Sequence, residues 1–320
     1  MPLMKNQKER IRQFKEQIPE LSELYSETGR QPMEKYLGDY HFETSFIKHY
    51  RAGEINRENQ NLFVQCFYAK EHKGTVFLVH GYLDHSGGLS VTINELLRHG
   101  YTVFTVDLPG HGLSQGEEGS IHSFKEYIDA VEDAYRAMHS YIPSGEIIGL
   151  GHSTGAAILF QSIGQKRIRL DRLVMAAPLY LPYQWKKTKG IIKMLSRIMP
   201  TSKRAFKRNS DDELYHQFIT RDPLQVHYLK ADWFFAMADW QEEIRYSPIV
   251  RLPVYLIQGE RDTTVDAKRT ISFYEQKCRY LQVCLVPEAR HQVLNERQVL
   301  REFVHRRILS FLDGTDRNWR

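Results

Sequence analysis

The run Gly151-His152-Ser153-Thr154-Gly155 has the residue types and spacing of a catalytic serine site. It fits the pattern G-x-S-x-G, follows the apolar residues 147–150 and precedes Ala156 and Ala157. A serine at a sharp turn between a strand and a helix exposes its hydroxyl, and the glycines leave room for the turn. The helix N-terminus then offers free N–H groups to a developing negative charge. The expected chemistry is acyl transfer through Ser153. The alternative is an ordinary serine–glycine turn, which the flanking strand and helix disfavour.

A serine hydroxyl needs a base to take its proton, and the base needs a carboxylate to orient it. In sites of this type the order along the chain is serine, acid, histidine. Asp262 lies just past the strand predicted for residues 254–257, and His291 lies in the loop after the strand predicted for 283–286. We therefore expect Asp262 to be the acid and His291 the general base.

Other candidates exist for both roles. The chain has 14 histidines, so it is the position of His291 after the last strand that selects it. Glu260 is still within the turn that ends its strand, whereas Asp262 is far enough along to reach a histidine in the next loop. Asp266 is the second choice for the acid.

Backbone N–H groups are expected to hold the oxyanion of the reaction. One donor is the residue after the nucleophile, Thr154, and the other belongs to the loop after the apolar run 77–79. There Gly81 permits a close backbone approach, so we predict the N–H of Tyr82 as the second donor. We expect His80 to brace this loop by hydrogen bonding and not to act as a second base.

The elements that must position these residues alternate between strands and helices. Continuous apolar strands joined by helices predict an α/β fold with a mostly parallel sheet covered on both faces. The predicted strands are 62–67, 75–79, 102–106, 147–150, 173–176, 254–257 and 283–286, and the predicted helices are 89–98, 124–141, 156–163, 267–277 and 298–312.

This alternation also predicts the domain organisation. We expect a core made of residues 46–182 and 249–320, and an inserted helical cap, 183–248, in which the sequence shows no convincing strand. We expect residues 1–45 to form an N-terminal extension with a helix that packs on the core. Its apolar residues at helical spacing are Ile11, Phe14, Ile18 and Leu21.

Composition limits the other classes of function. Hydrophobic residues make up 42% and charged residues 26% of the 320, no apolar run approaches the ~20 residues of a membrane span, and the basic start leads into no apolar stretch. The 3 cysteines have no CxxC spacing, which argues against a disulfide framework and a zinc site. We expect a cytoplasmic protein that needs no metal or cofactor. The sequence does not predict an oligomeric state.

Together these motifs resemble the α/β-hydrolase superfamily and, within it, the monoacylglycerol lipase and lysophospholipase group. The resemblance covers about residues 60 to 312. It rests on His80-Gly81, His85-Ser86-Gly87, the run from Val106 to Ser114, Gly151 to Gly155, Arg221-Asp222-Pro223-Leu224, Gly259 to Asp262, and His291. It implies an α/β-hydrolase fold with a helical cap. In this setting we interpret residues 107–114 as a packing loop in which Asp107 and His111 do no chemistry.

The sequence departs from this group in the loop after Gly81. Many members carry small residues there and then H-S-x-R-Y, whereas this chain has the bulky pair Tyr82-Leu83 and then His85-Ser86-Gly87-Gly88-Leu89. The mouth of the pocket is therefore expected to be shaped differently.

Residues 186–208 of the predicted cap are strongly basic, with an apolar helical face formed by positions 191, 194, 195, 198 and 199. A basic amphipathic helix suits the surface of an anionic membrane, and it also suits a cap helix packed on the rim. These two interpretations are compatible. No nucleic-acid-binding motif accompanies the charge, so we expect no nucleic-acid partner. The basic residues are Lys186, Lys187, Lys189, Lys193, Arg197, Lys203, Arg204, Lys207 and Arg208.

An aromatic cluster follows in the cap, formed by Trp233, Phe234, Phe235, Met237 and Trp240. Such clusters are more often core, but above a serine nucleophile this one suits the wall of an acyl-chain tunnel. We expect substrate contacts from Trp233, Phe234 and Met237. The predicted substrate is a lipid ester with one acyl chain, a monoacylglycerol or a lysophospholipid.

Three other functions are compared with this one. A serine peptidase of the iminopeptidase type uses the same triad but needs acidic cap groups to hold a free amino terminus, and the leading cap segment is basic. Dehalogenases and epoxide hydrolases carry aspartate where Ser153 stands. A catalytically silent binding module usually lacks one triad member, and this chain has candidates for all of them.

Overall fold

The protein is described here from a computed structural model that covers Leu21 and residues 34–315, except 59, 143, 186, 188 and 191–198. These residues form an eight-stranded sheet in the order β1-β2-β4-β3-β5-β6-β9-β10. The sheet is parallel from β4 to β10, and β2 pairs antiparallel with both β1 and β4. The expected mostly parallel sheet is confirmed. The strands are β1 (Ile47–Ile55), β2 (Leu62–Ala69), β3 (Gly74–Val79), β4 (Tyr101–Val106), β5 (Ile147–His152), β6 (Arg172–Ala176), β9 (Val250–Gly259) and β10 (Cys278–Val286).

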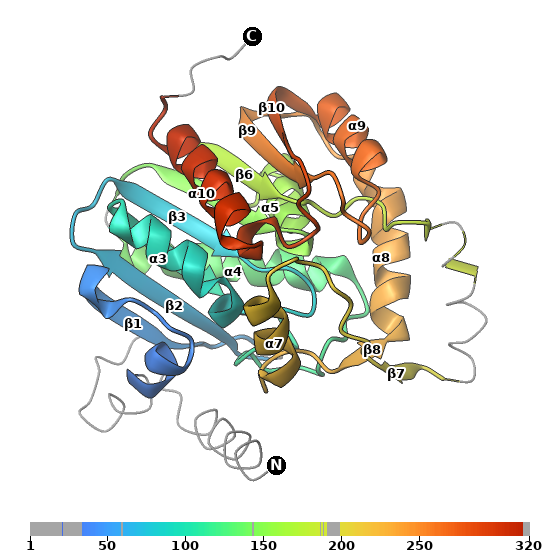
Figure 1. The fold of residues 1–320 in the computed structure, drawn as a ribbon, viewed down its shortest axis with the longest axis horizontal. Coiled ribbons are helices and arrows are strands. Elements are labelled where there is room, and N and C mark those ends of the chain that lie inside the picture. The colour runs from blue at the N-terminus through green and yellow to red at the C-terminus, as the bar shows by residue number, and fades with distance from the viewer. Residues whose placement is uncertain are drawn as a thin grey trace.

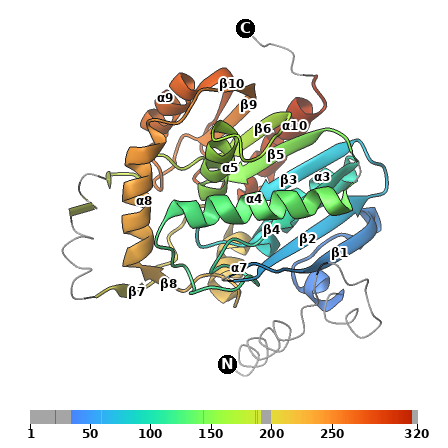
Figure 2. The same cartoon turned by 180° about the vertical axis from the view of Figure 1, so that it is seen from behind.

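Helices cover both faces of the sheet, which explains why β3 and β4 are buried along their whole length. Helices α3 (Ser90–Arg98) and α10 (Gln298–Leu312) lie on one face, in front of the sheet in Figure 1. Helices α4 (Phe124–Tyr141), α5 (Thr154–Gly164) and α9 (Ala267–Lys277) lie on the other, and Figure 2 shows α4 and α5 in front. Each face therefore has its own apolar core.

The segment between β6 and β9 contributes no strand to this sheet within the residues described. It contains α7 (Glu213–Arg221), α8 (Ala231–Ile244) and a small antiparallel pair, β7 (Thr201–Lys203) and β8 (Tyr228–Lys230), which gather at one end of the sheet (Figures 1 and 2). The expectation of a cap without strands is therefore wrong. Strands of three residues are too short to show a period in the sequence. Residues 191–198, most of the predicted basic helix, lie outside the described residues.

Strand β1 was not among the predicted strands. It is an edge strand with Lys48 and His49 exposed, so it lacks the continuous apolar run of a central strand. Before it, residues 34–39 are helical, and buried Tyr36 and Tyr40 anchor them. Of the predicted N-terminal helix only Leu21 is described, and its N–H donates to the Glu54 carbonyl at 2.9 Å.

Three short 3₁₀ turns complete the described elements: Thr44–Phe46, Ser86–Leu89 and Val293–Asn295. Among the described helices, none has the length and apolar character needed to cross a bilayer.

Candidate active site

Ser153 lies at the turn between β5 and α5, with φ 51° and ψ −112°. A residue other than glycine is strained in this backbone region. The two flanking glycines allow the turn because no side chain fits there. A Cβ on Gly151 would lie 2.4 Å from Ala156 Cα, and one on Gly155 would lie 2.3 Å from the Val79 carbonyl oxygen. The turn predicted from the sequence therefore has a clear steric cause.

The structure brings Ser153, His291 and Asp262 together. The Oγ of Ser153 lies 3.0 Å from Nε2 of His291, and Nδ1 of His291 lies 2.7 Å from Oδ2 of Asp262. All three side chains are buried. Because Asp262 accepts the proton on Nδ1, Nε2 of the neutral ring is left to accept the serine hydroxyl proton.

Asp262 is held as a carboxylate by its surroundings. Burial alone would raise its pKa, but His291 and the N–H groups of Thr264 and Val265 outweigh burial and lower the pKa below its ordinary value. Those two N–H groups bond Oδ1 at 2.7 and 3.0 Å, and Gln258 Nε2 donates to Oδ2 at 2.8 Å. Asp262 can therefore stay charged while it orients the imidazole.

The two other carboxylates are placed differently. Asp266 accepts the N–H of Arg269 at 3.1 Å and caps the N-terminus of α9. Glu260 is exposed. Of the three carboxylates considered from the sequence, Asp262 is the one hydrogen-bonded to His291.

The sequence analysis did not assign a role to His152. Its Nε2 donates to the backbone carbonyl of His291 at 3.2 Å, which ties the nucleophile strand to the loop of the base. Burial, followed by the neighbouring His291, lowers the pKa of His152 to about 3, so it is neutral. In the sequence, His152 is marked only by its position next to Ser153. A histidine in such a position is too common for a role to be assigned to it.

The predicted oxyanion donors belong to the loop after Gly81 and to the start of α5. Gly81 packs directly against the nucleophile turn, since a Cβ there would lie 3.2 Å from Ser153 Cβ. Thr154 is the first residue of α5, where N–H groups have no partner within the helix. In the described part of the chain no acceptor takes the N–H of Tyr82 or Thr154. Both groups are thus available to a ligand.

His80 braces this loop, as expected. Its Nδ1 donates to the Gly81 carbonyl at 2.8 Å and its Nε2 accepts the N–H of Leu108 at 2.9 Å. Burial lowers the pKa of His80 to about 3, which keeps the ring neutral in this role.

The loop after β4 is held together by its own side chains. Asp107 accepts the N–H of Leu113 at 2.9 Å and that of Ser86 at 2.8 Å. His111 Nδ1 donates to the Pro109 carbonyl at 2.8 Å. These contacts fit the interpretation of a packing loop.

The aromatic residues of the cap occupy several environments. Trp233 and Met237 are buried, whereas Phe234 is half-buried and Phe235 is 39% exposed. Trp240 packs on Phe124 of the core and donates to Gln161 Oε1 at 2.5 Å. Trp240 therefore fixes α8 to the core.

Among the described residues no group of histidine, cysteine, aspartate and glutamate side chains could hold a metal ion. Ser153, Asp262 and His291 follow the carboxyl ends of β5, β9 and β10 in a mostly parallel sheet, which carries an inserted cap between β6 and β9. The fold and this site define a serine hydrolase with the α/β-hydrolase fold. The chain matches the family described as Serine aminopeptidase, S33, over residues 70–298, and it belongs to that family.

Its relatives agree with the resemblance seen in the sequence. The chain is 26% identical over 270 residues to Monoglyceride lipase of Rattus norvegicus, covering 76% of this chain and 87% of that protein. It is 26% identical over 251 residues to Phospholipase YtpA of Bacillus subtilis, covering 74% and 94%. A solved structure of a soluble variant of monoglyceride lipase from Saccharomyces cerevisiae, in complex with a substrate analog, has the same fold. Its TM-score is 0.70 at 19% identity, covering 82% of this chain and 94% of that one.

Proposed function

We propose that this protein hydrolyses carboxylic esters of lipids with a single acyl chain, a monoacylglycerol or a lysophospholipid. The observation that carries the proposal is the chain of hydrogen bonds from Ser153 through His291 to Asp262. The relatives named as a monoglyceride lipase and a phospholipase support a lipid ester as the substrate. The apolar side chains of α8 near the Tyr82 loop support an acyl chain bound below the cap, with Trp233, Phe234 and Met237 as proposed contacts.

The proposed mechanism has two acyl-transfer steps. His291 Nε2 takes the proton of Ser153 as Oγ attacks the ester carbonyl, and the N–H groups of Tyr82 and Thr154 hold the resulting oxyanion. His291 then returns the proton to the leaving alcohol, which leaves an acyl-enzyme. A water molecule, deprotonated by the same nitrogen, attacks this intermediate and releases the fatty acid. Asp262 stabilises the imidazolium in both steps.

The test is hydrolysis of a chain-length series of p-nitrophenyl esters, monoacylglycerols and lysophospholipids by the wild type and Ser153→Ala. We expect the variant to lose activity by several orders of magnitude, on the order of 10⁴-fold or more. Equal activity of the two proteins would overturn the nucleophile. A wild type that is inactive and does not react with a fluorophosphonate probe would instead indicate a silent binding module.

A peptidase of the iminopeptidase type is the second candidate, since the family is described as an aminopeptidase. A free amino terminus needs an unpaired acid near the site. Of the cap acids near the Tyr82 and His291 loops, Asp211 is paired with Arg290 at 2.8 Å and Asp222 with His85 at 2.7 Å. Aminoacyl amides belong in the same assay, and activity confined to them would overturn the lipid substrate but not the triad.

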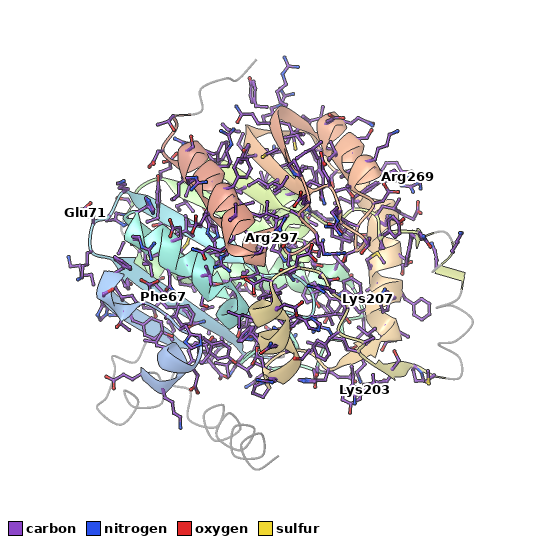
Figure 3. The ribbon with its side chains drawn as sticks, viewed as in Figure 1. Phe67, Glu71, Lys203, Lys207, Arg269 and Arg297 are labelled. Atoms are coloured by element: carbon purple, nitrogen blue, oxygen red, sulfur yellow. The ribbon has the colours of Figure 1, made fainter. Side chains whose placement is uncertain are left out.

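Contact of the basic segment 186–208 with an anionic membrane is part of the proposal. Two of its arginines have other partners, because Arg208 pairs with Glu213 and Arg204 bonds the core. Among the described residues of the segment, the exposed lysines that remain for lipid contact are Lys187, Lys189, Lys203 and Lys207, and Figure 3 labels the last two. We expect sedimentation with vesicles that contain anionic lipid, weakened by salt. Equal sedimentation with neutral vesicles would contradict the contact.

A further inference from the structure

The loop that follows Gly81 is fixed to the cap by consecutive residues. Each of the residues 82–85 contacts a different cap side chain, and the cap residues come from four separate positions between 204 and 233. Tyr82 stacks on Trp233, the Leu83 carbonyl accepts from Arg204, Asp84 accepts from Gln225, and His85 donates to Asp222. A cap that merely covers the pocket does not require contact with every residue of this loop.

Leu83 shows why the loop needs such support. Its φ is 71°, in the left-handed backbone region that residues other than glycine rarely adopt. A residue held there costs roughly 1–3 kcal/mol, and it stays there only where its surroundings fix it. Arg204 Nη1 donates to the Leu83 carbonyl at 3.1 Å. The bond holds the strained residue directly after the proposed oxyanion donor Tyr82.

Arg204 also supports the next residue through a relay. The same Nη1 donates to Gln225 Oε1 at 3.2 Å, and Gln225 Nε2 donates to Asp84 Oδ1 at 2.9 Å. Asp84 is buried, and burial raises its pKa despite His85 and Gln225. Without Arg204 the amide of Gln225 would lose a bond that orients it, and Asp84 would lose one of the cations near it, with His85 as the other.

Tyr82 is fixed at both ends of its side chain. Its ring lies 3.7 Å from that of Trp233, with the planes 10° apart, and its hydroxyl donates to the Gly119 carbonyl at 2.9 Å. The bulky residue that departs from the lipase pattern therefore has a structural partner in the cap helix α8. A shift of α8 would therefore remove the ring contact that helps to hold Tyr82 in place.

We propose that the cap positions the oxyanion hole, with Arg204 as the main positioning residue and Trp233 as the second. The cap segment from 204 to 233 is then a fixed part of the catalytic centre, not a lid that leaves it. The inference rests on the proposed function, because it needs the Tyr82 N–H to serve as an oxyanion donor.

The test compares Arg204→Met with Lys230→Gln in the full chain. Lys230 is a matched control because its side chain pairs with Glu117 at 2.6 Å, which also joins cap to core. The contact of Lys230 with the Tyr82 hydroxyl is made by its backbone, which the substitution keeps. Three readouts are needed: kcat and KM on a p-nitrophenyl ester, inhibition by an alkyl trifluoromethyl ketone, and inhibition by an alkyl glycerol ether. Ser153 Oγ adds to the ketone and forms an oxyanion, whereas the ether has no carbonyl and reports binding alone.

For Arg204→Met we expect kcat to fall about 10-fold or more, with KM unchanged, because the loss of a whole oxyanion donor is worth 10²–10³-fold. The inhibition constant of the ketone should rise by a similar factor while that of the ether stays the same. Lys230→Gln should match the wild type in all three. If Arg204→Met does not fold, Arg204→Lys replaces it, because lysine keeps the charge but lacks the fork of donors.

A second variant tests the strain itself. Asparagine tolerates the left-handed region better than leucine. Leu83→Asn added to the Arg204 variant should therefore recover part of the lost kcat.

Two results would overturn the inference and leave the proposed function intact. One is an active wild type whose Arg204 variants behave like Lys230→Gln. The other is an equal rise in the inhibition constants of ketone and ether, which would mean that Arg204 shapes substrate binding. A wild type that neither hydrolyses esters nor binds the ketone would overturn the proposed function, and the inference with it.

Discussion

The buried carboxylate of Glu296 accepts the backbone N–H of Arg290, the residue before His291, at 2.7 Å. Its other oxygen accepts the N–H groups of Asp211 at 3.0 Å and Arg297 at 3.2 Å. Both oxygens are thus used by backbone donors from the base loop and the cap. Glu296 joins the loop of His291, the proposed base, to the cap, as the contacts of residues 82–85 join the loop after Gly81 to it.

Glu296→Gln should destabilise the protein and slow the reaction. The amide replaces one acceptor oxygen with an NH₂ group, so a buried N–H is left without an acceptor, at about 1–3 kcal/mol. Urea unfolding and kcat measure the two effects. Glu288→Gln is the matched control, because Glu288 lies in the same loop but is exposed. Its ion pair with Arg297 contributes at most about 1 kcal/mol. Equal unfolding midpoints for the two variants would contradict the role of Glu296.

Gly155→Ala should abolish activity and lower the free energy of unfolding by about 3 kcal/mol or more. The added Cβ would lie 2.3 Å from the Val79 carbonyl oxygen, and a backbone atom cannot move aside as the end of a side chain can. Thermal unfolding and ester hydrolysis test this. Gly38→Ala is the control, since no atom lies within 4 Å of its Cβ and alanine favours the helical residues 34–39. That variant should be at least as stable as the wild type, and a Gly155 variant of equal stability would refute the steric account of the turn.

Much of the fold could be predicted because buried parallel strands and amphipathic helices leave strong periodic signals. Helix α4 has the predicted bounds, since an apolar stripe and a capping box at Ser123 and Glu126 mark it in the chain. Strand β1 and the β7–β8 pair were missed because an exposed edge and strands of three residues carry no such signal.

The triad could be proposed from order along the chain and from the strand ends that present its members. The contacts of Arg204 with Leu83 and of Trp233 with Tyr82 could not, because they join residues 121 positions apart or more. The left-handed conformation of Leu83 could not be predicted either, because leucine does not favour that conformation. From its charge, Arg204 was placed in a basic segment that suits either an anionic membrane surface or a cap helix packed on the rim, and the structure shows it bonded to the Leu83 carbonyl of the core.

Asp222→Asn should destabilise the protein most near neutral pH. Burial alone would raise the pKa of Asp222, but His85, Tyr40 and the N–H of Leu224 hold it below its ordinary 3.8. A depressed carboxyl pKa contributes stability above the unfolded value and loses it as the pH falls through the folded value. The difference in unfolding free energy between wild type and variant should therefore shrink below pH 3.8. It should also shrink as His85, whose pKa Asp222 raises to about 9 despite burial, loses its proton. A difference that stays constant across this pH range would show that the charge of Asp222 adds nothing to the free energy of unfolding.

His152→Phe should reduce kcat about 10-fold without changing the shape of the pH–rate profile near neutrality. The variant loses the donor to the His291 carbonyl, so the base is less well held over Ser153, and small misplacements of reacting groups are costly. The shape should persist because the pKa of His152 is about 3, so the ring carries no proton that titrates in the assay range. The measurement is kcat over a pH series for wild type, His152→Phe and the exposed-site control His139→Gln. A shifted or missing limb in the His152 profile would mean that His152 takes part in proton transfer, which a positioning role does not predict.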